Sequence, residues 1–262
     1  MLKKKINIWW SYNGGVPNFG DELNPFLIGL MTNHTINRIK KIKWFSFKRV
    51  NLAIGSIIQA SKSNCNVWGS GIIEKNAIIS GGKIFAVRGP RTRKRLLELG
   101  LDCPEIYGDP ALLLPRYIKR NQDIKYKYGI IPHVVDYELF VEKDIKDTLV
   151  IDLRKDVITV LKNIWSCEKI ISSSLHGLIV PHSYGIPAIW VKFSDKLYGD
   201  NVKFIDYFES VGIEPYDITL TDPDSYNTKF IDDLFSKYNN ISSIKFNLNQ
   251  IQDNLISSCP FL

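Results

Sequence analysis

The segment from Ile170 to Val191, IISSSLHGLIVPHSYGIPAIWV, carries the clearest chemistry in this sequence. An apolar run there leads into three serines, and His176 and Gly177 follow in the expected first turn of a helix. Serine hydroxyls and the unpaired N–H groups of a helix N-terminus favour a bound phosphate. His176 could then be a general acid whose pKa a bound anion raises, or simply a hydrogen-bonded histidine at a helix start. Both interpretations stay open on these residues alone.

Two more histidines bear on this site. His182 lies six residues after His176 and off the same helix face, so we expect it to be structural. His133, in GIIPHVVD, follows another predicted strand. It could share the same cleft, because ligands gather at the carboxyl ends of parallel strands.

A glycine-rich segment, Ser11–Leu23, stands between the first predicted strand and the first predicted helix. Glycine lets the backbone approach a ligand closely, and we predict that Asn18 and Gly20 contact substrate there. Asp21 sits where a helix N-cap is expected, so it is either a cap or a carboxylate of the site. The spacing is not GxGxxG, and the dinucleotide-binding fingerprint is therefore absent.

Basic residues gather in FAVRGPRTRKRLLELG, where a strand is expected to end and a helix to begin. Arg88 stands beside the helix N-terminus and could hold a phosphate or carboxylate with two parallel hydrogen bonds. Arg91, in the first turn, is disfavoured by the helix dipole unless an anion neutralises it. Arg93 and Lys94 fit a solvated helix face.

Two other motifs follow predicted strands. In VWGSGI, Gly69 and Gly71 flank Ser70, which suits an anion or sugar contact through backbone N–H groups or else a tight turn. In YGDPALLLP, Asp109 precedes a proline, and a structural cap on a short helix is expected.

Short apolar runs alternate with amphipathic stretches, and this alternation predicts the elements that position these residues. The predicted strands are Lys5–Trp10, Val50–Gly55, Asn66–Gly69, Lys83–Arg88, Tyr128–Pro132, Thr148–Asp152, Lys169–Ser172 and Ala188–Phe193. The predicted helices are Asp21–Met31, Pro90–Gly100, Val157–Ser166, Leu175–Tyr184, Asn201–Val211, Phe230–Asn239 and Ser242–Ser258. The pattern indicates parallel βαβ units, and hence an α/β fold of two Rossmann-like domains facing a cleft.

The charges divide the chain in the same way. Residues 1–120 hold 20 Lys and Arg against 7 Asp and Glu, whereas residues 121–262 hold 14 against 20. We predict a basic domain over residues 1–118, a second domain over 119–240, and a C-terminal helix in 241–262 that packs back across both. A basic half is compatible with nucleic acid, an anionic membrane surface or phosphorylated substrates, and equally with solvated lysines.

Composition excludes several classes. Hydrophobic residues make up 45% and charged residues 23%, as in folded proteins rather than disordered ones. The four cysteines are far apart and the histidines do not cluster, so neither a disulfide framework nor a metal site is expected. MLKKKINIWW lacks the long apolar stretch of a signal peptide, and no window reaches 18 apolar residues. We expect a cytoplasmic protein, with peripheral contact at the inner membrane face left open.

Taken together, these motifs resemble the polysaccharide pyruvyl transferase family. The resemblance rests on NFGDEL (Asn18–Leu23), WGSG (Trp68–Gly71), VRGPRT (Val87–Thr92), YGDPALL (Tyr107–Leu113), IPH (Ile131–His133), SSSLHG (Ser172–Gly177) and GIP (Gly185–Pro187). Each motif is modest alone, but their order over residues 7–193 is specific. The resemblance implies a glycosyltransferase-B-like pair of Rossmann-like domains.

It also implies a reaction: transfer of the enolpyruvyl unit of phosphoenolpyruvate to two hydroxyls of one sugar, giving a cyclic pyruvate ketal and phosphate. Phosphoenolpyruvate would be the donor substrate, with no other cofactor. A sugar or lipid-linked oligosaccharide of a surface or exopolysaccharide precursor would be the acceptor. Many members have an arginine two residues before the catalytic histidine, where this sequence has Ser174. The anion contact could then shift to Arg91 or Lys192.

The resemblance implies that His176 is the catalytic acid and that Arg88, or else Arg91, binds the donor. Asp21 or His133 would accept the hydroxyl proton. The predicted substrate-binding residues are Asn18, Gly20, Gly69, Ser70, Gly71, Arg88, Arg91, His133, Ser174, Leu175 and Gly177.

Two rival functions remain at this point. A glycosyltransferase of the same architecture that uses a nucleotide sugar would need a carboxylate in the second domain, for example Asp195 or Glu209. A nucleic-acid-binding module would interleave aromatic and basic side chains. Such a cluster exists at Trp44, Phe45, Phe47, Lys48 and Arg49, but it adjoins predicted core strands, and no nucleic acid partner is expected.

Overall fold

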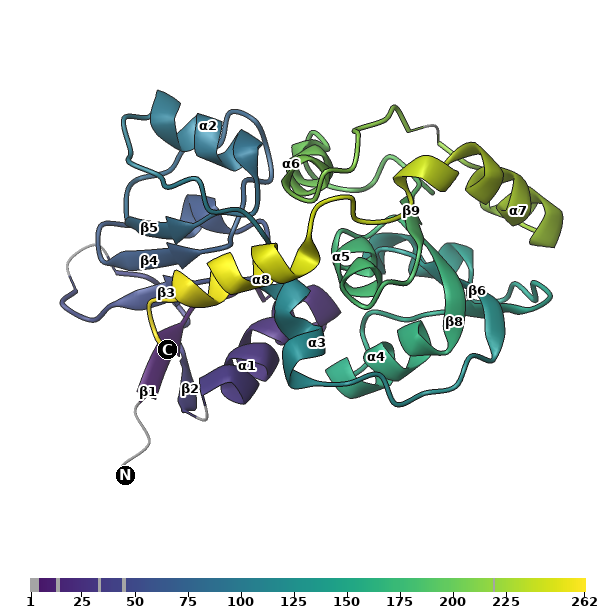
Figure 1. The fold of residues 1–262 in the computed structure, drawn as a ribbon, viewed down its shortest axis with the longest axis horizontal. Helices are drawn as coiled ribbons and strands as arrows, with labels where there is room; N and C mark the ends of the chain where they lie inside the picture. Colours follow the sequence, from purple (N-terminus) through teal and green to yellow (C-terminus); the bar gives the residue numbers. More distant parts are fainter. Residues whose placement is uncertain (1–4, 13–14, 33, 44–45, 219) are drawn as a thin grey trace.

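The computed structural model describes residues 5–12, 15–32, 34–43, 46–218 and 220–262, and its strands form two parallel sheets (Figure 1). The first sheet has the order β2-β1-β3-β4-β5, with β1 Lys5–Ile8, β2 Thr35–Arg38, β3 Val50–Leu52, β4 Cys65–Trp68 and β5 Lys83–Ala86. The second has the order β7-β6-β8-β9, with β6 Tyr126–Ile131, β7 Thr148–Val150, β8 Cys167–Ser172 and β9 Ala188–Trp190. The predicted α/β class with parallel strands is confirmed.

The helices alternate with the strands. They are α1 Phe19–Thr32, α2 Pro90–Glu98, α3 Leu114–Tyr117, α4 Val157–Trp165, α5 His176–Ser183, α6 Val202–Ser210, α7 Thr228–Lys237 and α8 Leu248–Ser257. Each coincides with a predicted helix except α3, a single turn that is absent from the sequence-based prediction. The last helix starts later than the predicted Ser242, because the Asn247 side chain caps it by accepting from the Gln250 N–H.

The edge strand β2 is also absent from the sequence-based prediction. Its four residues read TINR, with Thr35 and Asn37 exposed, so it lacks the apolar run of a buried strand. Its pairing with β1 decides its conformation, in register from Thr35 opposite Lys5 to Arg38 opposite Ile8.

One apolar cluster runs through both halves of the chain. Ile8 and Leu23 from the first half belong to the same cluster as Ile164 and Leu178 from the second, and all four are fully buried. Because burial of apolar surface is the main stabilising term in folding, this shared core holds the two sheets in a fixed relation. The domain limits at residues 118 and 240 stay a prediction.

The C-terminal segment crosses from the second half to the first (Figure 1). The Ala188 N–H donates to the Ser242 carbonyl beside the second sheet. Farther on, α8 lies against the first half, where Trp68 Nε1 donates to the Leu255 carbonyl at 2.9 Å and Gln252 Nε2 donates to the Leu112 carbonyl at 2.7 Å. The C-terminal helix thus packs against the first half of the chain.

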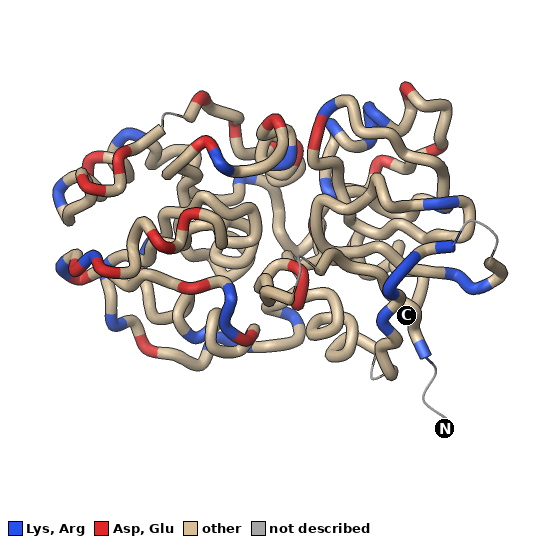
Figure 2. Tube along the Cα trace, turned by 180° about the vertical axis from the view of Figure 1, so that it is seen from behind, with Lys and Arg blue, Asp and Glu red and all other residues tan. Residues whose placement is uncertain are grey.

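Figure 2 shows the Lys and Arg positions of the first half spread over its strands and loops rather than gathered in one stripe. Within the described part of the chain, no helix is both long enough and apolar enough to span a bilayer.

Candidate active site

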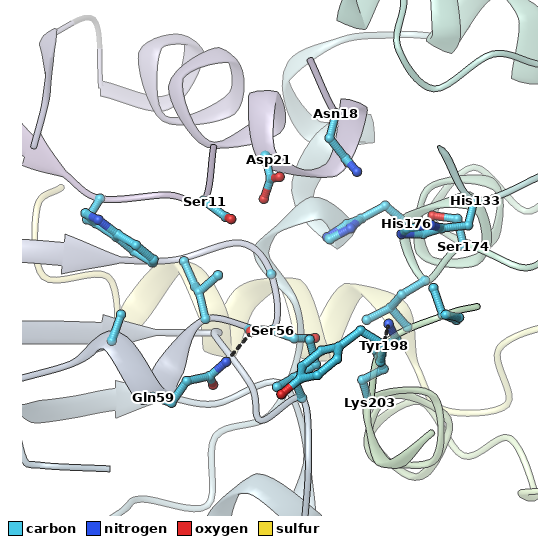
Figure 3. A pocket seen from close by; sticks show the side chains of 17 residues that line it. Ser11, Asn18, Asp21, Ser56, Gln59, His133, Ser174, His176, Tyr198 and Lys203 are labelled. Atoms are coloured by element: carbon cyan, nitrogen blue, oxygen red, sulfur yellow. Dashed lines mark hydrogen bonds between the residues drawn. The ribbon is translucent and has the colours of Figure 1, made fainter. Parts of the chain in front are cut away.

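A cavity of about 420 Å³ lies between the two sheets, where the carboxyl ends of their strands face each other (Figure 3). The loops that follow β1 and β3 supply its wall from the first half. The loops that follow β6 and β8, together with α6, supply the wall from the second half. Side chains with ionisable or hydrogen-bonding groups that line it include Ser11, Asn18, Asp21, Ser56, His133, Ser174, His176, Tyr198 and Lys203.

His176 is the first residue of α5, and its imidazole reaches across to the first half. Nε2 lies 3.5 Å from Oδ2 of Asp109, and neither of these buried atoms has a hydrogen-bond partner among the described residues. The other face of the ring packs on Gly20, where a Cβ would collide with Nδ1. Nε2 is thus buried against Asp109, and Nδ1 is the ring atom nearest to Gly20.

Asp109 therefore has two roles. Its Oδ1 accepts from the Ala111 N–H at 2.9 Å and caps the short 3₁₀ helix Pro110–Leu113, as expected from the sequence. Its Oδ2 faces His176, which the sequence pattern alone did not indicate. The side chain is fully buried.

The turn before α5 is built by Ser172. Its Oγ donates to the Ile131 carbonyl at 2.8 Å and accepts from the Ser174 N–H at 2.9 Å. A Cβ at Gly177 would collide with this hydroxyl, so Gly177 is needed for close packing and does not line the cavity. Ser174 and Leu175 do line it. In the first turn of α5 the Leu178 N–H donates to the Leu175 carbonyl at 3.0 Å, and the N–H groups that precede it favour an anion.

Asp21 is free to act in the cavity because Asn18, not Asp21, caps α1. Oδ1 of Asn18 accepts from the Gly20 N–H at 3.0 Å, and its carbonyl accepts from the Glu22 N–H. Burial raises the pKa of Asp21 to about 6, an effect that the neighbouring His176 partly offsets. A carboxylate with that pKa can take and release a proton near neutral pH.

Asn24 fixes this part of α1 against the first sheet. Its amide Nδ2 donates to the Asp21 and Ile54 carbonyls, and its Oδ1 accepts from the Ile54 N–H at 3.0 Å. This side chain is fully buried. It sets the position of Asp21 relative to the Gly55–Ser56 loop on the opposite side of the cavity.

His133 lines the cavity as predicted. A hydrogen bond from its backbone N–H fixes its position. The His133 N–H donates to Ser173 Oγ at 2.8 Å, and Ser173 Oγ donates to the buried carboxylate of Asp136 at 3.0 Å. Burial, and secondly the nearby Lys203, lower the pKa of His133 to about 4. At neutral pH this histidine is uncharged, so it can contribute hydrogen bonds but not a charge.

Lys203 was not predicted from the sequence. It stands on α6 and lines the cavity with only 8% of its surface exposed. Its Nζ donates to the Tyr198 carbonyl at 3.4 Å. Burial, and then the positive charge of Arg88, lower its pKa to about 8. The sequence NVKFIDYFES contained one indication of this position. Lys203 and the buried Tyr207 are four residues apart, so they lie on the same face of a helix.

Arg88 does not line the cavity. A direct contact between Arg88 and the donor would require that it did. Its side chain is fully buried, and Nε donates to Asp206 Oδ2 of α6 at 3.0 Å. One terminal nitrogen donates to Ser56 Oγ at 2.7 Å, and the other donates to the Ile72 carbonyl at 2.7 Å. Arg88 thus joins the two halves and reaches the cavity only through Ser56. Its donor-binding role stays a prediction that this position does not support.

Arg91 also faces a carboxylate of the second half. Nε and one terminal nitrogen of its guanidinium donate to Glu209, at distances of 2.6 to 3.1 Å. It lines a separate cavity of about 400 Å³ beside α2 and α6. The anion that Arg91 needs at the helix start is therefore supplied by the protein itself.

The glycines of WGSG pack rather than line the cavity. Gly69 has φ +81° and presses against Pro110, so its backbone conformation favours glycine. Ser70 Oγ donates to the Gly55 carbonyl at 2.9 Å, and Gly71 contacts the Arg88 guanidinium. These residues form the tight turn that was the alternative to a ligand contact. Of the other predicted segments, Asn13, Gly14, Trp44 and Phe45 lie outside the described residues.

The remaining histidine, His182, is structural as expected. It is almost fully buried, and its two nitrogens lie within hydrogen-bond distance of Tyr207 Oη and the Ala188 carbonyl. Among residues that the structure describes, no three His, Cys, Asp or Glu side chains gather in a way that could hold a metal ion.

Comparison with known proteins identifies a related family. The family model described as polysaccharide pyruvyl transferase matches residues 41–195, a stretch that includes Asp109, His133 and His176 but not Asp21 or Lys203. An uncharacterized protein of Acanthamoeba polyphaga mimivirus is 35% identical over 212 residues, which is 75% of this chain and 72% of that protein. No solved structure matches.

Proposed function

The chain belongs to the polysaccharide pyruvyl transferase family, and from this premise we propose that it transfers the enolpyruvyl group of phosphoenolpyruvate to a sugar. Two hydroxyls of one sugar receive the group, and the products are a cyclic pyruvate ketal and phosphate. The observation that carries the proposal is one cavity that brings His176 and Asp21 together from opposite halves of the chain.

The donor brings two anionic groups, a phosphate and a carboxylate, into this cavity. The N-terminus of α5 offers them unpaired N–H groups and a favourable helix dipole. Ser174 and Leu175 lie at this end of the helix and line the cavity. A donor held there has its reactive carbons beside the His176 imidazole.

His176 acts as the general acid. Nδ1 transfers a proton to the terminal methylene carbon of phosphoenolpyruvate, which becomes a methyl group. The adjacent carbon gains oxocarbenium character and is attacked by a sugar hydroxyl. Asp109 faces Nε2 and stabilises the imidazolium form of the ring before the proton leaves.

Asp21 accepts the proton of the attacking hydroxyl. Its pKa of about 6 makes it a stronger base than His133, whose pKa is about 4. The bond from the central carbon to the phosphate oxygen then breaks, and phosphate leaves. The second sugar hydroxyl attacks the same carbon and closes the ketal ring, and its proton leaves with the departing phosphate. The C=C π bond and the C–O bond to phosphate are thereby replaced by one C–H bond and two sugar C–O bonds.

The cavity wall also suits a sugar acceptor. Trp9 and the exposed Tyr198 line it, and such rings offer apolar faces together with a polar edge. We place the acceptor on this side, within a glycosyltransferase-B-like arrangement of the two sheets. A lipid-linked oligosaccharide would bring the protein to an anionic membrane surface, where the basic first half is favoured.

The decisive test is product analysis. The protein is incubated with phosphoenolpyruvate and a panel of free and lipid-linked sugars, and released phosphate and product mass are measured. We expect phosphate release coupled to a sugar product that carries the pyruvate ketal. His176→Ala should abolish both while the protein keeps its thermal unfolding temperature.

The same panel is run with nucleotide sugars in place of phosphoenolpyruvate. Glycosyl transfer from a nucleotide sugar, with no turnover of phosphoenolpyruvate, would overturn the proposal. Wild-type turnover by His176→Ala would remove that residue from the acid role.

A further inference from the structure

Lys203 is a buried cation, and it has no anionic partner among the residues that the structure describes. Across the residues that the structure describes, no carboxylate pairs with it, and its acceptor is the Tyr198 carbonyl at 3.4 Å. Burying a charge without a partner is costly. A lysine retained in such a place is stabilised when an anion enters the cavity beside it.

The other cations that were considered as ligands of the donor form ion pairs with carboxylates of the protein. Arg88 pairs with Asp206, and Arg91 pairs with Glu209. Lys192 pairs with Asp195 at 3.3 Å, and it does not line the cavity. Within the described chain, Lys203 is the one Lys or Arg side chain that lines this cavity.

Lys203 lines the same cavity as His133 and as Ser174 and His176 at the start of α5. The charge of Lys203 contributes to the lowered pKa of His133. Figure 3 shows Lys203 on the same side of the cavity as His133, Ser174 and His176. A ligand phosphate at the first turn of α5 would therefore lie between the helix N–H groups and an ammonium group.

We propose that Lys203 binds the phosphate of the donor and supplies the positive charge that Ser174 cannot provide. This assignment rests on the proposed function, since it takes phosphoenolpyruvate as the donor. An ammonium group suits phosphate as a compact point charge. On departure of the phosphate, the same charge stabilises the leaving group.

The test is direct binding of phosphoenolpyruvate and of inorganic phosphate, measured by calorimetry without an acceptor. Four proteins are compared: wild type, Lys203→Met, Lys203→Arg and Lys162→Met. Lys162 is an exposed lysine on α4, remote from the cavity lining, and serves as the matched control. Thermal unfolding shows that each variant is folded, and Lys203→Met should unfold no lower than wild type because it removes a buried charge.

We expect Lys203→Met to weaken both ligands by roughly 10- to 100-fold, the effect of one charge-assisted hydrogen bond. Lys203→Arg should recover most of the affinity, and Lys162→Met should bind as wild type does.

Three results would overturn the assignment. If wild type binds phosphoenolpyruvate, and Lys203→Met binds both ligands with the affinity of wild type, Lys203 has no part in binding and the proposed function stands. If Lys203→Met loses affinity for phosphoenolpyruvate alone, Lys203 contacts the carboxylate rather than the phosphate. If wild type itself binds no phosphoenolpyruvate, the proposed function fails together with the assignment.

Discussion

Oδ2 of Asp109 lies 3.5 Å from Nε2 of His176, although the two residues belong to different halves of the chain. Oδ1 of the same carboxylate is occupied by the Ala111 N–H, so the side chain cannot rotate without breaking that cap. The imidazole is thereby held between Asp109 and Gly20. A carboxylate that orients a histidine favours one tautomer and stabilises the charged ring.

Replacement of Asp109 tests this relationship. Asp109→Asn keeps an oxygen for the cap but turns an N–H toward Nε2, which disfavours a proton on Nε2 and hence the imidazolium form of His176. We expect kcat to fall by roughly 100-fold or more, with little change in the affinity for phosphoenolpyruvate. Steady-state kinetics and binding of the donor separate the two effects. An Asp109→Asn enzyme with wild-type kcat would contradict the role.

The pKa of Asp21 predicts a pH dependence of the rate. If Asp21 is the base, activity should fall as pH decreases through about 6, because the carboxyl becomes protonated. Asp21→Asn should lower kcat and remove this acidic limb. Both effects are measured from the pH profile of kcat for wild type and Asp21→Asn. If the variant keeps the same fall in kcat at acidic pH, another group is responsible for that fall.

Asp21 also predicts a pH dependence of stability, and this dependence is opposite to that of the rate: stability falls as pH rises. Burial raises the pKa of Asp21 above its unfolded value of 3.8, so the folded protein binds more protons between about pH 4 and 6. Stability from this group is therefore present at low pH and lost as pH rises through 6. Asp21→Asn should be more stable than wild type at pH 7, by up to about 3 kcal/mol, and this difference should vanish near pH 4. Urea unfolding at the two pH values measures it.

Gly20 provides a steric test of the His176 position. Gly20→Ala adds a Cβ that collides with the ring, and displacement of a reacting group by about 1 Å can cost roughly 100-fold in rate. Gly29→Ala is the matched control, because it lies on the same helix with open space around it. The control should keep full activity and gain about 0.4–1 kcal/mol in stability. Equal activity of both variants would refute the packing argument.

The two arginine–carboxylate pairs between the halves should differ in their effect on stability. Arg88→Met leaves Asp206 buried without its cation and should cost about 3–5 kcal/mol. Arg91→Ala removes a pair in which 49% of the arginine side chain is exposed, and should cost less than about 1 kcal/mol. Denaturant unfolding compares the two variants. Similar losses would show that burial does not distinguish these pairs.

The order of strands and helices could be predicted from the sequence, because it depends on local patterns. The apolar residues at the ends of YKYGII and CEKIIS identify β6 and β8, and Pro90 marks the start of α2. The site residues His133 and His176 could be found because they follow strands, where parallel sheets place their ligands.

Local pattern could not decide which polar side chains face the cavity. Asp21 and Asn18 are both acceptable helix caps, and only the path of the chain shows that Asn18 takes this role. Arg88 also follows a strand, yet its partner Asp206 lies 118 residues away and withdraws it from the cavity. In the sequence, Lys203 is indistinguishable from a solvent-exposed lysine on a helix. It is buried only because α6 packs against the second half of the chain.

The sequence by itself therefore determined the α/β class, the parallel strands and the position of His176 at a helix start. The tertiary structure alone decided which charges are paired within the protein and which are left for a ligand. The physical reason is that hydrophobic periodicity acts over a few residues. A buried charge, in contrast, must find its partner wherever the fold brings one, because leaving it unpaired costs more than any local preference.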